Sequence, residues 1–230
     1  KIELPIPADA LDVVKRYATN GREAVNMIQI AGGLALTSKR QEISRADLEW
    51  VVNSGQYAPR PDKSIPLAPQ VGLVNGLAIY GSNMGTLIEV EATAFPVEQG
   101  KGKLVITGIM EEEEMGGYGR TMRRKSMAKS SMDNVLTVMR QHLHTYPQDY
   151  DIHVNFPGGS PIDGPSAGIA MVTAIYSAIT GRKVSNVVAM TGEVSIRGLV
   201  KPGGGVAAKL EAARLAGVTW AIIPNDNLQS

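Results

Sequence analysis

The sequence contains no cysteine, which excludes disulfide bonds and thiolate metal sites. Aromatic residues are scarce, with two Phe, two Trp and seven Tyr, so the core is built from aliphatic and small side chains. No apolar run reaches the ~18 residues of a membrane-spanning helix, and the start, KIELPIPADALDVVKRY, lacks the apolar region of a signal peptide. The 23 basic and 22 acidic residues nearly balance, so we expect no nucleic-acid partner.

The residues that are present indicate a folded protein. A chain of 230 residues with 43% hydrophobic residues is long and apolar enough for one large domain or two small ones. Glycine and proline are abundant, with 25 and 13 copies, and they cluster at particular points of the chain. The chain starts on Lys rather than Met, so we expect it to be part of a longer protein. The absence of cysteine favours a cytoplasmic location.

The first quarter of the chain has the apolar periodicity of α-helices. Helices are predicted at Pro7–Tyr17, Arg22–Ser38 and Arg45–Ser54. Ser44 stands at the N-cap position of the third helix, with an acidic residue three positions later, which is a capping box. A proline-rich connector follows over residues 57–69 and predicts a domain boundary there.

After the connector, runs rich in Val, Ile and Thr alternate with helical patterns. Strands are expected at Gly72–Ile79, Gly85–Ala94, Leu104–Gly108, Tyr150–Phe156, Val187–Thr191 and Ala221–Ile223. Helices are expected at Ser126–His142, Ser166–Thr180 and Val206–Gly217, and residues 111–125 are expected to form a polar loop. Strands and helices mix without a strict βαβ rhythm, so we assign the larger part to the α+β class.

The most specific local motif is D-G-P-S-A-G at residues 163–168. Gly and Pro set a stiff turn before an almost wholly apolar helix, and Ser166 falls in its first turn, where backbone N–H groups are available for a developing oxyanion. A serine hydroxyl needs a neighbouring base to act as a nucleophile. Ser166 has two interpretations on this motif alone: a helix N-cap, or a nucleophile.

Candidate bases are few. The sequence has three histidines: His142 and His144 fall at a polar helix end, and His153 alternates with apolar residues in a strand, so no Ser-His-Asp triad is evident. Lys209 lies on a predicted helix among small apolar residues, and burial of a lysine lowers its pKa until the neutral amine becomes a competent base. The alternative is that Lys209 pairs with a carboxylate on an exposed helix face.

Several motifs together resemble the proteolytic domain of Lon proteases. They are D-G-P-S-A-G at 163–168, M-T-G-E at 190–193, I-R-G at 196–198, and the series from Pro202 through Lys209 to Pro224. The resemblance runs from about Pro69 to the end of the chain, and the motifs agree in order as well as in spacing. It implies an α+β peptidase domain over residues 70–230.

The Lon resemblance also implies roles for individual residues. Ser166 is expected to be the nucleophile and Lys209 the base of a Ser-Lys dyad. Thr191 is expected to orient the lysine, and Asp163, beside the nucleophile, to support the site. Other stretches, such as I-H-V-N-F-P and the run of four Glu, resemble the bacterial B-type Lon subgroup. Gly203 departs from the pattern, because the family usually has a branched apolar residue there.

The helical N-terminal region, residues 1–56, resembles the lid subdomain of a AAA+ ATPase. N-G-R-E-A around Arg22 resembles the sensor-2 motif that contacts nucleotide phosphates; the alternative is a surface charge. No G-x-x-x-x-G-K-[ST] loop occurs, so ATP and magnesium are expected in the full-length protein and not on this chain. The chain ends soon after Pro224, where the family usually continues, so the end of the domain is expected to be missing or disordered.

The expected function is ATP-dependent serine proteolysis of unfolded or regulatory proteins by a homohexameric ring in the cytoplasm. Two other functions stay open. One is a Lon-like peptidase that needs no ATP, and the other is a non-catalytic assembly module with a Lon-like fold. Five basic residues over 120–129 do not change the expectation about nucleic acid, because the preceding Glu run opposes them and aromatic residues are few.

Overall fold

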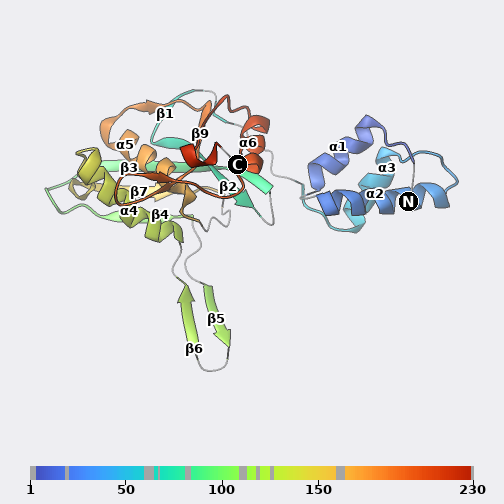
Figure 1. Ribbon diagram of the computed structural model, residues 1–230, viewed down its shortest axis with the longest axis horizontal. Coiled ribbons are helices and arrows are strands. Elements are labelled where there is room, and N and C mark those ends of the chain that lie inside the picture. The colour runs from blue at the N-terminus through green and yellow to red at the C-terminus, as the bar shows by residue number, and fades with distance from the viewer. Residues whose placement is uncertain are drawn as a thin grey trace. The chain divides into compact units, whose positions relative to one another are not determined.

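The chain divides into two compact units (Figure 1). One comprises Lys1–Asp62 with Gly81–Met84, and the other Lys63–Tyr80 with Gly85–Ser230; we call them the helical unit and the α+β unit. The computed structural model describes residues 4–18, 21–59, 65–66, 68–80, 84–108, 113–117, 120–124, 127–158 and 164–228. Each unit is described by itself.

The helical unit contains α1 (Ala8–Tyr17), α2 (Gly21–Thr37) and α3 (Arg45–Ser54), each within a residue of its predicted range. Their apolar faces meet in a small core, whose fully buried residues include Met27, Ile43 and Leu48. The helices therefore form by the ordinary route, in which amphipathic faces gain stability by packing on one another.

The capping box at the start of α3 is confirmed. The Asp47 backbone N–H donates to Ser44 Oγ at 3.3 Å, and the Ser44 backbone N–H donates to Asp47 Oδ2 at 2.8 Å. Arg40 adds a bidentate pair to the same carboxylate, with both distances 2.6 Å. The Arg40 guanidinium holds the pKa of the buried Asp47 carboxyl well below its usual range. The N-terminus of α3 is thus held by the Arg40–Asp47 ion pair as well as by the capping box.

The α+β unit is built on a mixed sheet with the order β12-β9-β2-β3-β7-β4 among the described residues. Its strands are β2 (Leu73–Tyr80), β3 (Met84–Pro96), β4 (Leu104–Thr107), β7 (Tyr150–Asn155), β9 (Val188–Met190) and β12 (Trp220–Ile222). Strand β9 runs parallel to both β12 and β2, β4 runs parallel to β7, and β3 is antiparallel to β7. A mixed sheet of this kind confirms the α+β class.

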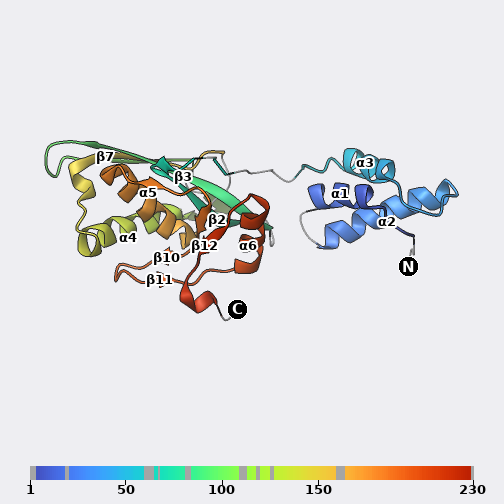
Figure 2. The same ribbon diagram turned by 90° about the horizontal axis from the view of Figure 1, so that it is seen from above.

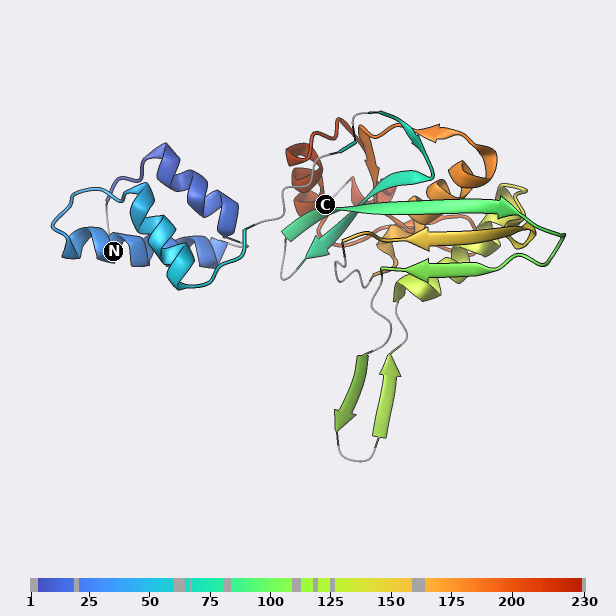
Figure 3. The same cartoon turned by 180° about the vertical axis from the view of Figure 1, so that it is seen from behind.

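Helices α4 (Met127–His142) and α5 (Gly168–Thr180) cover one face of the sheet, as the view from above shows (Figure 2). Their side chains build the main core with inward residues of the strands; its largest fully buried members include Phe156, Met132, Met139, Met171 and Ile175. Figure 3 shows the other side of β3, β7 and β4. There the period-2 alternation of β7 leaves His153 exposed, while its neighbours Ile152 and Val154 are buried.

Helix α6 (Val206–Leu215) packs on the sheet face opposite to α5, at the β2–β9 end. Its core partners are Leu77, Leu87 and Ala189, which alternate along their strands with residues of the main core. Strand alternation therefore places α5 and α6 on opposite faces of the sheet.

The remaining elements are short. Two-residue ladders join β1 (Gln70–Val71) to β8 (Lys183–Val184) and β10 (Glu193–Val194) to β11 (Val200–Lys201). The 3-10 turns are η1 (Pro147–Asp149), η2 (Pro165–Ala167) and η3 (Asn225–Asn227). The expectation of a polar loop over residues 111–125 is wrong in part, because Glu113–Gly117 and Arg120–Arg124 form the antiparallel ladder β5–β6. Few apolar residues occur there, so the segment has no alternation that predicts strands.

Candidate active site

Ser166 lies in the 3-10 turn Pro165–Ala167, just before α5. Its backbone carbonyl accepts a hydrogen bond from the Gly192 N–H at 2.8 Å, and the Ile169 N–H returns one to the Gly192 carbonyl at 3.2 Å. The turn is therefore tied to the segment that follows β9. The N-cap of α5 is Ala167, so the interpretation of Ser166 as the helix N-cap is wrong.

The backbone amides at this helix start are partly used. The Gly168 N–H bonds the Pro165 carbonyl, and the Ile169 N–H bonds Gly192. Because these two amides already have acceptors, the backbone N–H groups that could bind an oxyanion at the start of α5 are those that precede Gly168.

Lys209 lies on α6 and is 2% exposed. Its Nζ donates a hydrogen bond to Thr191 Oγ1 at 3.1 Å. Burial lowers the pKa of the Lys209 amine, because the interior disfavours the charged form. The interpretation of Lys209 as a cation on an exposed helix face is wrong.

Thr191 follows β9 directly and is 1% exposed. Its backbone N–H donates to the Ile222 carbonyl at 3.1 Å, which continues the ladder from β12. The backbone is fixed by the sheet, so the hydroxyl has a defined position from which it accepts the Lys209 hydrogen bond. The structure thus brings Thr191 and Lys209 together, as expected.

Ser166 Cβ and Lys209 Nζ both lie close to the space beside Gly203. A Cβ added to Gly203 lies 3.5 Å from Lys209 Nζ and 3.6 Å from Ser166 Cβ. The serine arrives from the start of α5 on one face of the sheet, and the lysine from α6 on the other. A hydroxyl and a desolvated amine that share such a space are the groups that nucleophilic catalysis without histidine requires.

The sequence profile of the Lon protease (S16) C-terminal proteolytic domain matches residues 42–230. The chain belongs to the Lon protease family. It is 54% identical over its whole length to "Lon protease 2" of Bacillus subtilis (strain 168). It is 40% identical over 80% of its length to "Lon protease 1" of Thermus thermophilus, and 33% identical over 99% of it to "Lon protease" of Bacillus thuringiensis. The chain spans 41%, 22% and 28% of these relatives, respectively.

Two other candidate residues of this Lon chain, Arg22 and His153, lie elsewhere. Asp163 falls outside the described residues. Arg22 lies in the first turn of α2, in the helical unit, where an open depression runs along the helix. His153 is exposed on the sheet face opposite to α5, and its Nε2 lies 2.9 Å from Thr107 Oγ1. Among the described residues, no three His, Asp or Glu side chains form a metal-binding group.

Two residues that lie beside the candidate site were missed from the sequence. Gly85, in β3, is the first of them. A Cβ added to it would lie 1.9 Å from the Ala208 carbonyl oxygen of α6, so only a glycine fits at this contact. The backbones therefore touch one residue before Lys209. An isolated glycine inside a strand pattern is a known sign of such an approach. Asn227 is the second, and the sequence carries no comparable signal for it.

Because β3 and α6 approach closely at Gly85, replacing this glycine by alanine should lower peptidase activity more than the same change at a glycine with open space around it. Gly85→Ala has to displace α6 and with it Lys209, and a shift of about 1 Å costs about a hundredfold in rate. Gly204→Ala adds a Cβ that has no heavy atom within 4 Å, so we expect ordinary activity. Peptidase assays of both variants, with circular dichroism to verify folding, make the comparison. Equal activity of the two alanine variants contradicts the positioning role of Gly85.

Proposed function

We propose that this chain carries the peptidase centre of an ATP-dependent Lon protease that degrades unfolded or regulatory proteins. Ser166 is the nucleophile and Lys209 the general base. The observation that carries the proposal is the buried Lys209 amine, which is bonded to Thr191 and borders the same space as Ser166. The family match supports a serine peptidase domain.

In the proposed reaction, Ser166 Oγ attacks the carbonyl carbon of a peptide bond while the neutral Lys209 amine takes the hydroxyl proton. Backbone amides beside Ser166 hold the oxyanion of the tetrahedral intermediate. The Lys209 ammonium then returns the proton to the leaving amine, and the C–N bond breaks. Water attacks the acyl-enzyme with the amine again as base, which releases the carboxylic acid and restores the serine.

Burial suits Lys209 to this role. An ordinary lysine is charged at neutral pH and has no lone pair to accept a proton. Because burial lowers the pKa of Lys209, a larger fraction of the amine is neutral. The hydrogen bond to Thr191 fixes the direction of one N–H of Lys209, and this restricts the orientation of the nitrogen lone pair. We therefore keep Thr191 as the orienting residue and Asp163 as a supporting one.

We further propose that residues 1–56 are the lid of a AAA+ ATPase, residues 57–69 a linker and residues 70–230 the peptidase domain. Arg22, in the first turn of α2, would contact the phosphates of ATP bound with magnesium in the full-length protein, because the sequence around it resembles the sensor-2 motif. The chain has no phosphate-binding loop, so no step is assigned to nucleotide here. None of the helices in the described ranges has the length and apolarity to span a bilayer.

The resemblance to the B-type subgroup, a hexameric ring and a cytoplasmic location belong to the same proposal. The subgroup and the ring rest on the Lon resemblance, and the cytoplasmic location rests on the absence of cysteine. A ring would enclose the peptidase sites to which unfolded substrate is fed. Size-exclusion chromatography with light scattering on the full-length polypeptide reports the ring directly.

Casein degradation by the full-length polypeptide tests the proposal. We expect degradation with ATP and magnesium, little without them, and none in Ser166→Ala under either condition. Degradation of casein that is equally fast without nucleotide favours the ATP-independent peptidase. An inert wild-type protein that still assembles favours the non-catalytic module and contradicts the proposal.

A further inference from the structure

The side chain of Asn227 binds the loop before α6 at Gly203. The Gly203 N–H donates to Asn227 Oδ1 at 3.1 Å, and Asn227 Nδ2 donates to the Gly203 carbonyl at 3.0 Å. One amide side chain thereby satisfies both backbone groups of the glycine that borders Ser166 and Lys209. Asn227 is 9% exposed, so these bonds are largely shielded from water.

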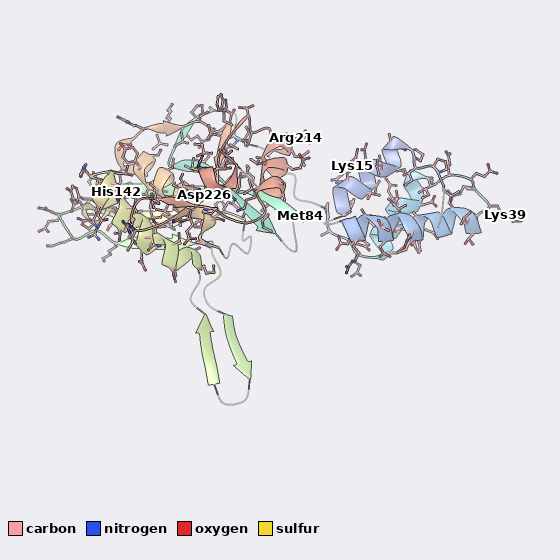
Figure 4. All side chains as sticks on the ribbon, viewed as in Figure 1. Lys15, Lys39, Met84, His142, Arg214 and Asp226 are labelled. Carbon is pink, nitrogen blue, oxygen red and sulfur yellow. The ribbon has the colours of Figure 1, made fainter. Side chains whose placement is uncertain are left out.

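Asn227 itself has a fixed place. It ends the turn η3, in which its backbone N–H donates to the Pro224 carbonyl at 3.0 Å. The strand β12 just before this turn provides the Ile222 carbonyl that accepts the Thr191 N–H. The same segment, residues 222–227, therefore holds both neighbours of the Lys209 amine: Thr191 through Ile222, and Gly203 through Asn227. Figure 4 locates the turn by Asp226 and α6 by Arg214.

We propose that Asn227 is a positioning residue of the Ser166–Lys209 centre, acting by clamping Gly203. The proposal rests on the dyad proposed above. The clamp requires one donor and one acceptor attached to the same carbon atom, which the asparagine carboxamide provides. A carboxylate accepts but does not donate, and an aliphatic side chain does neither.

Gly203 has no side chain that could pack against Ser166 and Lys209. The position of its backbone, which the clamp holds, therefore affects the reaction. The distance of Lys209 and Ser166 from the loop is then set by where the backbone is held. Release of the loop admits water to the amine, which restores solvation of the charged form and raises the lysine pKa. It also loosens the geometry of attack. Loss of the clamp therefore lowers kcat more than it raises KM, and moves the acidic limb of the rate profile to higher pH.

Two substitutions separate the parts of the clamp. Asn227→Asp keeps the acceptor for the Gly203 N–H but loses the donor to its carbonyl and adds a negative charge near the amine. Asn227→Leu loses both bonds without adding charge. Asn225→Asp is the matched control, because Asn225 lies in the same turn and is exposed.

The experiment measures kcat, KM and the pH–rate profile for a fluorogenic peptide in the full-length polypeptide, with thermal unfolding of every variant. We expect both Asn227 variants to lose about tenfold or more in kcat, with the acidic limb displaced upward. Asn225→Asp should match the wild type. Asn227 variants with unchanged kcat and limb overturn the inference, as does a loss of activity that follows the folded fraction with no change in the limb.

Ser166→Ala and Lys209→Met are measured in the same assay. If both are inactive and the Asn227 variants behave as wild type, the inference about Asn227 fails while the dyad stands. If either dyad variant keeps full activity, the proposed function fails and the inference falls with it.

Discussion

Replacing Lys209 by Met is expected to lower kcat/KM for peptide cleavage by about a thousandfold or more, as loss of the base does in other serine hydrolases. Met matches the shape of the lysine stem and lacks the amine. The position is buried beside Val206 and Ala213, so an apolar side chain is well accommodated there. We expect the folded protein to be at least as stable as the wild type, because a buried amine that is costly to charge is removed.

The control for this substitution is Lys201→Met, which makes the same change at an exposed lysine of β11. It should retain wild-type activity, which excludes a general effect of removing positive charge. Fluorogenic peptide assays in the full-length polypeptide, with urea unfolding of each variant, provide both measurements. A Lys209→Met protein with activity near that of the wild type contradicts a role of Lys209 as base.

The rate of cleavage should rise with pH up to the pKa of Lys209 and then level off, because only the neutral amine accepts the serine proton. Below that pKa the rate falls about tenfold per pH unit, as the neutral fraction does. Burial lowers the pKa of Lys209, so the limb lies below the ordinary lysine value of about 10.4. The pH dependence of kcat/KM over the alkaline and neutral range gives the position of the limb.

Because the pKa of Lys209 is lowered in the folded state, the stability of the fold depends on pH. In the folded state Lys209 loses its proton at a lower pH than in the unfolded chain, so between the two pKa values the unfolded state binds more protons. Stability therefore rises with pH through this window, and the rise should be absent in Lys209→Met. His142→Gln and His153→Gln should leave the limb of the rate unchanged. A limb that disappears in either variant assigns the titration to an imidazole and contradicts the lysine base.

Local patterns in the sequence predicted the helices and the long strands well. The capping box at Ser44 and the 3.6-residue periodicity located α1, α2 and α3 within a residue, since these signals depend on neighbours in sequence. The expected strand Gly85–Ala94 extends to Met84–Pro96. Ladders such as β1–β8 and β10–β11 were missed, because two residues contain no period.

The site was only partly accessible from the sequence. Motif order indicated Ser166, Lys209 and Thr191, but the burial of Lys209 and its bond to Thr191 depend on packing between α6 and the sheet. The sequence left Ser166 open as a helix cap because a 3-10 turn before α5 is not distinguishable from a first helical turn. Asn227 acts on Gly203 across 24 residues, and no local rule predicts such a contact.

In the proposed mechanism, Ser166 is a nucleophile activated by the buried amine of Lys209. The most direct test is the rate at which a fluorophosphonate probe labels the full-length polypeptide, with the modified residue mapped by mass spectrometry. We expect an adduct on Ser166 in the wild type, none in Ser166→Ala, and labelling of Ser166 slowed by about a hundredfold or more in Lys209→Met. An adduct on a different serine, or equally fast labelling of Lys209→Met, contradicts this mechanism.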